Sequence, residues 1–141
     1  MSDAGIRSSK FLRVGELYSR DDLRRAFRIH DATLNNGIFR PKGHSSVWLF
    51  VTERKTPDRT PYKDRLNGHD LYMDGQTRGR TDNFVVEHRE RGLELLLFYR
   101  EEKSQYPRAA FRFEGAFEYV AHSGAKPAQF HLTRCESVAG T

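Results

Sequence analysis

Two basic loops that contain glycine have the residue types needed to bind an anion. The first reads GIFRPKGH and has no acidic residue, and the second reads DGQTRGRTD. Glycine allows the backbone to approach a ligand closely, and arginine presents a planar fork that matches phosphate oxygens. A helix that began at Thr81 would add unpaired N–H groups beside the second loop. The residues predicted to contact phosphates are Arg40, Lys42, His44, Arg78, Arg80 and Thr81.

Flat side chains near both loops fit the recognition of a nucleobase that has left its duplex. Trp48 follows the first loop and Tyr72 precedes the second. Stacking on such rings contributes roughly 1–3 kcal/mol per base, which is the same order as the few kcal/mol that unstacking costs. Asp82 could accept a hydrogen bond from a cytosine amino group, and Gln76 offers both a donor and an acceptor. The other residues predicted at the wall of this base pocket are Tyr18, Asn36 and Phe39.

Ordinary structural roles for the same residues stay open. The second loop can be a solvated hairpin turn with Asp-Gly at its tip. Trp48 can be a core side chain, and Asp82 can simply begin a helix, where the dipole favours an acidic residue. The residue types alone leave both interpretations standing.

Sequence signatures of enzymes and metal sites are missing. The chain has no GxxxxGK[ST], GxGxxG, GxSxG or HExxH motif. His131 and Cys135 form a single HxxxC pair without the second pair that a tetrahedral zinc site needs. We therefore expect no catalytic residue, no metal and no cofactor. A small enzyme with Asp82 or His88 as its acid or base is the alternative.

Composition and charge favour one β-rich domain with an acidic partner. The 141 residues are 37% hydrophobic and 30% charged, with ten Phe and six Tyr, which suits a single core. Residues 1–80 carry 16 basic and 10 acidic side chains, whereas residues 81–141 carry 8 and 9. The basic half is thus where nucleic acid would bind. The lone Cys135 and the lack of any long apolar run predict a cytoplasmic protein.

The pattern along the chain predicts flexible ends at 1–10 and 136–141 around one domain at 11–135. SRDDLRRAFRIH is typical of an amphipathic helix capped by Ser19, with Leu23 and Phe27 facing the core. Arg24, Arg25 and Arg28 then lie toward solvent, where phosphate contact is the alternative to a solvated face. DNFVVEHRER predicts a second helix capped by Thr81 and ended by Gly92, with a strand at 84–86 as the competing interpretation.

Several apolar runs predict strands. SVWLFVTE, HDLYM, LELLLFYR and QFHLTR are short enough for buried strands, and FRFEGAFEY alternates. The alternation predicts one face that carries Phe111, Phe113, Gly115, Phe117 and Tyr119. Six or so strands without regular βαβ alternation indicate an α+β fold, a small mixed or antiparallel β-barrel with two short flanking helices.

Four ordered blocks resemble a module at the C-terminal end of bacterial helicase-like and HNH-nuclease restriction proteins. They are NNGIFRPKGHSSVWLFVTE, DGQTRGRTD, GLELLLFYRE and FRFEGAFEYVAHSGAKPAQFHL, and the resemblance covers 17–134. The module is similar to the PUA superfamily, which includes SRA domains that flip 5-methylcytosine and YTH, EVE and ASCH domains that bind nucleic acids. The resemblance implies a β-barrel with a base-sized pocket. SRA-type readers use aromatic rings and a carboxylate, for which Trp48, Tyr72 and Asp82 are the matches here.

The resemblance and the residues together predict a non-catalytic, nucleoid-associated reader of double-stranded DNA that carries 5-methylcytosine. The chain has no helicase motif and no HNH block, so cleavage or unwinding would come from a separate nuclease or helicase partner. An RNA-binding PUA-like module is the first alternative, because relatives of this kind also read RNA. A small enzyme on the same barrel and a protein-interaction domain with an exposed apolar patch are the others.

Overall fold

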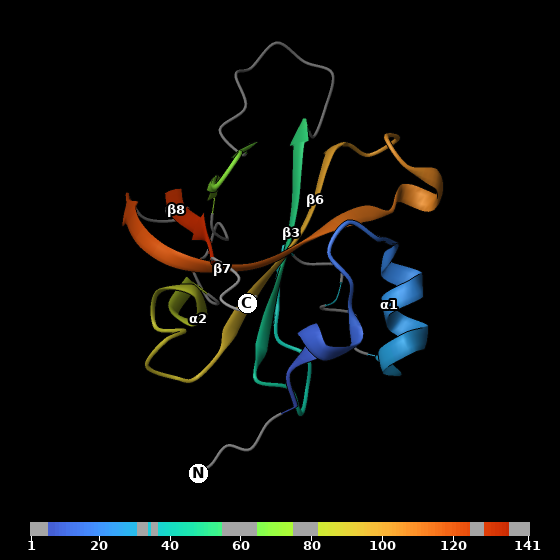
Figure 1. Cartoon of the computed structure of the whole chain (residues 1–141), viewed down its shortest axis with the longest axis horizontal. Coiled ribbons are helices and arrows are strands. Elements are labelled where there is room, and N and C mark those ends of the chain that lie inside the picture. The colour runs from blue at the N-terminus through green and yellow to red at the C-terminus, as the bar shows by residue number, and fades with distance from the viewer. Residues whose placement is uncertain are drawn as a thin grey trace.

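The computed structural model describes residues 6–30, 34, 37–54, 65–74, 82–124 and 129–135. Eight strands form one mixed sheet in this part of the chain (Figure 1). The helices are α1 (Arg20–Phe27) and α2 (Asp82–Val86), with 3₁₀ turns η1 (Ser8–Phe11) and η3 (Pro107–Ala109). The strands are β1 (Leu17–Tyr18), β2 (Ile38–Phe39), β3 (Ser46–Arg54), β4 (Arg65–Asn67), β5 (Asp70–Asp74), β6 (Glu94–Glu102), β7 (Phe111–Ser123) and β8 (Gln129–Arg134).

The sheet is open, and the predicted closed barrel is wrong. Its strand order is β2-β3-β6-β7-β8-β5-β4, with β1 paired to β7 off this path. β3 and β6 are parallel, and the other pairs are antiparallel. The end strands β2 and β4 have two and three residues and do not pair with each other, so no ladder among the described residues closes the sheet. The mixed sheet with two short helices agrees with the predicted α+β class.

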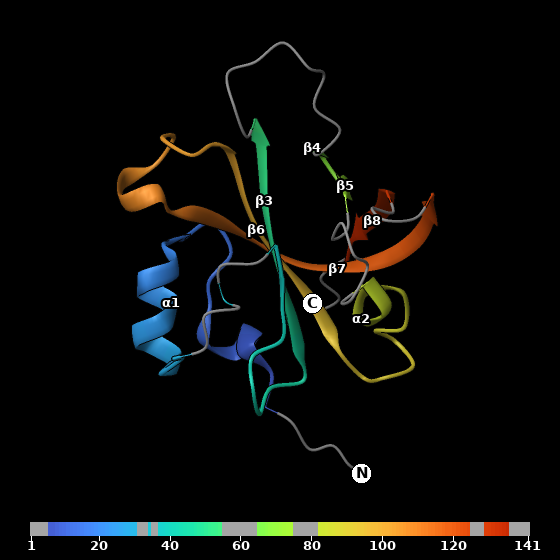
Figure 2. The ribbon, with the colours of Figure 1, turned by 180° about the vertical axis from the view of Figure 1, so that it is seen from behind.

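Apolar side chains fill a separate core on each face of the sheet, and Figures 1 and 2 show α1 and α2 on opposite sides of β3 and β6. We call these the α1-side core and the α2-side core. The α1-side core consists of Leu12, Leu23, Ile29, Leu34, Phe39, Trp48, Phe50, Leu96, Phe98, Phe111 and Phe113. The α2-side core consists of Ile38, Val47, Leu49, Val51, Leu71, Met73, Val85, Leu93, Leu95, Leu97, Tyr99, Phe117, Phe130 and Leu132. Both cores draw on β3 and β6, which explains their continuous apolar sequences.

A β-bulge in β7 overturns the prediction that its aromatic residues share one face. Consecutive residues of β6 pair with Gly115 and Phe113, so Glu114 is the extra residue. Gly115 has φ of +93°, a conformation that glycine adopts without strain. Because one extra residue moves the following side chains to the opposite face, Phe113 packs in the α1-side core and Phe117 in the α2-side core.

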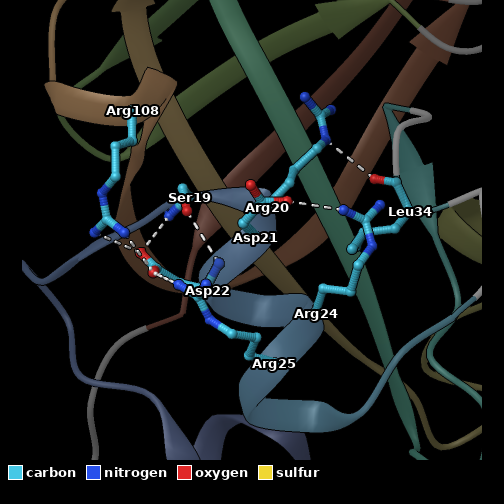
Figure 3. A network of polar contacts seen from close by, with 8 residues as sticks. All are labelled: Ser19, Arg20, Asp21, Asp22, Arg24, Arg25, Leu34 and Arg108. Carbon is cyan, nitrogen blue, oxygen red and sulfur yellow. Dashed lines mark hydrogen bonds and ion pairs between the residues drawn. The ribbon is translucent and has the colours of Figure 1, made fainter.

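The predicted N-cap of α1 is confirmed. The Ser19 hydroxyl accepts a hydrogen bond of 3.0 Å from the Asp22 N–H, and the Asp22 carboxylate accepts one of 2.9 Å from the Ser19 N–H. Arg108 of η3 donates to both Asp22 oxygens, at 3.1 and 3.2 Å (Figure 3). Hydrogen bonds from Ser19, followed by the charge of Arg108, lower the pKa of Asp22. As predicted, Leu23 is buried, while Phe27 is only half-buried.

The second helix is shorter than predicted. α2 ends at Val86, and turns lead from there to Gly92, whose φ of +70° precedes β6. The competing interpretation of 84–86 as a strand is wrong. No helix in the described ranges is both long and apolar enough to span a membrane.

Buried His88 makes stability depend on pH. Its Nδ1–H donates to the Leu93 carbonyl at 3.0 Å, and its Nε2 accepts from the Tyr119 N–H at 3.1 Å, so the neutral ring has both partners. Burial lowers the pKa of His88 below 6.5, and the charge of Arg89 adds to this. The unfolded chain therefore binds more protons than the folded chain below about pH 6.5, and stability falls as the pH drops through that value.

Urea unfolding between pH 7.5 and 5 measures this loss in the wild type and in His88→Gln. We expect the variant to be less stable at pH 7.5 but to lose less stability on acidification. The remaining pH dependence includes His44, whose pKa is also lowered by burial. An identical pH slope in both proteins would show that His88 does not titrate on unfolding.

Candidate nucleic-acid interface

A cavity of about 510 Å³ lies between the C-terminal end of α1 and the connection from β2 to β3. Two side chains on its wall are exposed cations, Arg28 and Lys42, and none of the described residues that line it is acidic. Its volume falls in the range of ligand pockets, about 300–1,000 Å³. The full lining is Phe27, Arg28, Ile29, His30, Phe39, Pro41, Lys42 and His44.

The end of α1 forms one wall of the cavity. α1 ends at Phe27, and the next residue, Arg28, has φ of +54° and ψ of +49°. This left-handed conformation favours glycine and strains an arginine by about 1–2 kcal/mol. It turns the chain, so that the Ile29 N–H reaches the Arg24 carbonyl at 2.9 Å. The strained Arg28 thereby stands on the cavity wall.

The opposite wall is a tight turn with the sequence PKGH. The His44 N–H donates to the Pro41 carbonyl at 3.2 Å, and Gly43 has φ of +82°, as the third residue of a type II turn requires. Phe39, one residue before Arg40, pairs with Trp48 across β2 and β3. The turn therefore projects from the end of a paired ribbon, and Lys42 lies at its exposed tip.

Packed aromatic rings form the floor of the cavity. The ring centroids of Phe27 and Trp48 are 5.0 Å apart, and those of Phe39 and Trp48 are 5.5 Å apart. The Phe27 ring also meets the His44 ring edge-on at 5.5 Å. Trp48 is fully buried, so it supports the floor from below. Two rings of the wall thus rest on one buried tryptophan, and the His44 ring packs against one of them.

Hydrogen bonds from Ser8 fix the protonation of His44. The Trp48 Nε1–H, which can only donate, bonds to the Ser8 Oγ at 3.0 Å. The one hydroxyl proton of Ser8 is then available for the His44 Nδ1 at 2.8 Å. This assigns the proton of neutral His44 to Nε2. Burial lowers the pKa of His44, an effect that Glu94 partly opposes, and this favours the neutral ring.

Glu94 anchors this arrangement to β6. Its carboxylate accepts from the Ser46 hydroxyl at 2.6 Å, the Ser9 hydroxyl at 2.7 Å and the Ser9 N–H at 3.1 Å. The Ser46 Oγ in turn accepts from the Ser8 N–H at 3.0 Å. The segment from Ile6 to Lys10, predicted as part of a flexible end, is therefore held against β3 and β6, and Ser8 is fully buried.

Comparison with known proteins finds a shared fold among the solved structures. No protein-family model matches the chain, and no curated protein matches it. The solved structure described as "Modification dependent TagI restriction endonuclease" matches 90% of this chain with a TM-score of 0.52 and 21% identity. The two share a fold. The match covers 51% of the endonuclease, so the chain spans about half its length.

The structure brings together three of the predicted site residues and separates others. Phe39, Lys42 and His44 meet at the cavity on the fold shared with the endonuclease. Trp48, predicted as a pocket wall, is instead a core side chain, which was the open alternative. The predicted residues that lie outside the described ranges are Asn36, Gln76, Arg78, Arg80 and Thr81.

Tyr72 and Tyr18 are not among the described residues that line the cavity. Tyr72 of β5 stacks on His131 of β8 at 4.7 Å, and β8, β7 and β6 separate β5 from β3 in the sheet order. Tyr18 packs edge-on against the α1-side core, and its OH accepts from the Arg13 N–H at 3.0 Å. Asp82 is half-buried at the start of α2. None of Trp48, Tyr72 and Asp82 is among the described residues that line the cavity at the end of α1.

Arg40, whose predicted phosphate contact stays a prediction, makes structural contacts within the protein. Its Nε donates to the Ser46 carbonyl at 3.1 Å and its Nη2 to the His44 carbonyl at 3.2 Å. Its guanidinium lies over the Phe84 ring, 5.1 Å from the centroid. Burial and the nearby Arg91 charge lower the pKa of Arg40. Arg40 thus holds the two ends of the PKGH turn together from the α2 side.

Sequence reasoning missed the contribution of α1 to the cavity. Phe27 was predicted to face the core and Arg28 to face solvent, and neither was assigned to the pocket. The alternation of charged and apolar residues gave no signal that the helix would end in a left-handed arginine. His131 was considered as half of a metal pair with Cys135, but it bonds to Asp70 at 2.9 Å. Among the described residues, no group of three or more potential ligands could hold a metal ion.

Proposed function

We propose that the chain is an SRA-like, non-catalytic reader of DNA that carries a modified cytosine, most specifically 5-methylcytosine. The observation that carries this proposal is the cationic, aromatic cavity between α1 and β3. The fold it shares with a modification-dependent restriction endonuclease supports the same role. In this proposal the chain recognises DNA, and a separate nuclease or helicase partner cuts or unwinds it.

The cavity replaces the predicted pocket as the place for a flipped base. Phe27 and Phe39 offer apolar ring surface for the base, and stacking on aromatic side chains is worth about 1–3 kcal/mol per base. The Nε2–H of His44 would donate to an acceptor atom of the base edge. Arg28 and Lys42 at the rim would hold the neighbouring phosphates, because exposed cations bind phosphate regardless of sequence.

Selectivity for one methyl group should be modest. Burial of a methyl group contributes about 1 kcal/mol, which corresponds to a five- to tenfold preference at most. We expect a duplex with one 5-methylcytosine to bind about that much more tightly than its unmodified counterpart in fluorescence anisotropy at constant salt. A fluorescent base analogue placed beside the methylated cytosine should brighten on binding, because base flipping removes its stacking partner.

A matched pair of variants ties this preference to the cavity. Phe27→Leu keeps an apolar side chain beside Trp48 but removes the ring, and we expect it to lower the methylation preference. Tyr72→Phe changes a ring that stacks on His131 outside the cavity, and it should leave the preference unchanged. Equal affinity of the wild type for modified and unmodified duplexes would refute the modified-base reading. Tighter binding of single-stranded RNA would establish the RNA-binding alternative instead.

A further inference from the structure

Two guanidinium groups share one aromatic ring beneath the first turn of α1. The Cζ of Arg20 lies 5.1 Å from the Phe111 centroid, and the Cζ of Arg100 lies 3.9 Å from it. Arg20 also lies over Phe50 at 4.5 Å. Each contact is a favourable cation–π interaction. Together, however, they place two positive charges close to each other in a partly dry environment.

Neutral groups accept the hydrogen bonds that both arginines make to the described residues. The Arg20 Nε donates to the Leu34 carbonyl at 3.1 Å. The Arg100 Nε donates to the Thr52 hydroxyl at 2.8 Å, and its Nη1 donates to the Ala109 carbonyl at 2.6 Å. In the part of the chain that the structure describes, no carboxylate forms an ion pair with either one.

Another close arginine pair, Arg112 and Arg134, is neutralised. Arg112 and Arg134 both bond to the buried carboxylate of Glu114, at 2.6 and 3.2 Å. Among the described residues, this pair therefore has a counter-charge, whereas Arg20 and Arg100 have none. Burial, and then the charges of Arg100 and Arg24, lower the pKa of Arg20 to about 10. An anion at this position would relieve that repulsion.

The half-buried side chain of Arg20 begins a basic stripe on α1. Arg20 and Arg24 are four residues apart, which places them on one side of the helix, and Arg28 follows just past the helix end. Arg24 is also paired with Asp21 at 3.0 Å. Arg20 and Arg24 are both drawn in Figure 3. With a rise of 1.5 Å per residue, the stripe is about 12 Å long, long enough to follow several phosphates of one strand. Its far end, Arg28, lies on the wall of the cavity.

We propose that Arg20, reinforced by the charge of Arg100 behind it, binds a backbone phosphate of nucleic acid, and that the stripe leads the strand from there to the cavity. Arg100 is only 7% exposed, so it acts through its charge, while Arg20 makes the contact. The proposal rests on nucleic-acid binding as proposed above but is independent of any modified base. Free phosphate shares the chemistry, and the experiment separates the two sources.

The test uses the salt dependence of binding to a short unmodified duplex. Arg20→Gln keeps an aliphatic stem beside Phe50 and removes the charge. Loss of one phosphate contact lowers the slope of log affinity against log salt by about 0.9, which is about an eightfold loss of affinity at 0.1 M salt. The control is Arg25→Gln on another side of α1, where Arg25 is 72% exposed and already paired with Asp22. We expect less than a twofold change for the control.

The outcomes distinguish this site from the proposed function. A shallower slope in folded Arg20→Gln, with an unchanged ratio of methylated to unmethylated affinity, supports the phosphate site. An unchanged slope in the folded variant overturns it. If the wild type binds no duplex at all, the proposed function fails. Binding of inorganic pyrophosphate then tests the anion site at Arg20 by itself. Pyrophosphate should raise the melting temperature of the wild type more than that of Arg20→Gln, and equal shifts would overturn the site.

Discussion

Replacing Arg28 by glycine and Lys42 by alanine should weaken DNA binding about 60-fold at 0.1 M salt, because two phosphate contacts are lost. The double variant should not lose stability. Arg28 has a left-handed backbone with φ of +54°, which glycine adopts without strain. Lys42 is exposed at the tip of the PKGH turn, and its loss removes little packing. The two substitutions should therefore lower affinity while leaving the melting temperature equal or higher.

Anisotropy titrations at several salt concentrations and a thermal melt measure the two effects separately. The slope of log affinity against log salt should become shallower by about 1.8. Arg89→Ala with Lys103→Ala is a control with the same change in charge, at exposed positions outside the cavity lining. Equal losses of affinity in both double variants would mean that binding follows overall charge, and the cavity would have no special part in it.

Removal of the Glu94 carboxylate should cost about 3 kcal/mol of unfolding free energy, because each buried donor left unpaired costs about 1–3 kcal/mol. Glu94→Ala leaves the hydroxyls of Ser9 and Ser46 without their acceptor. The Glu94 side chain is only 9% exposed, so water replaces the lost bonds poorly. Because Ser46 also holds Ser8, the variant should loosen the contact of Ser8 with His44.

Urea unfolding monitored by tryptophan fluorescence measures this loss, since Trp48 is the only tryptophan and bonds to Ser8. Glu87→Ala removes a carboxylate that is 39% exposed and paired with Arg91 four residues away. Such exposed pairs contribute less than about 1 kcal/mol. Equal losses of unfolding free energy in the two variants would mean that the buried Glu94 network stabilises the fold no more than an ordinary surface ion pair does.

Local sequence patterns predicted the elements whose signals are themselves local. Ser19 and Asp22 form the predicted cap of α1 because a capping box depends on residues only three positions apart. The apolar run LELLLFYR became β6, which is buried on both faces. The alternation in FRFEGAFEY failed at Gly115, because the bulge depends on pairing with β6 and that partner is distant in the sequence.

The candidate site depended more on tertiary contacts than on motifs. Lys42 and His44 were predicted beside a ligand because their loop is basic and rich in turn residues, and both line the cavity. Trp48 was predicted to line the pocket on similar grounds. It lies on a strand that is covered on both faces, and it is completely buried. Phe27 and Arg28 joined the cavity only through the end geometry of α1. A pattern of residue types contains no information on which helix end meets which turn.

The bulge at Gly115 has a consequence for how the molecule melts. β7 supplies Phe113 to the hydrophobic interior beneath α1 and Phe117 to the interior beneath α2. A single continuous strand is therefore part of both interiors. Neither interior can come apart while the other keeps its share of that strand in place. We therefore expect the two cores to unfold as one cooperative unit. A substitution that destabilises the α2-side core should also destabilise the cavity on the α1 side.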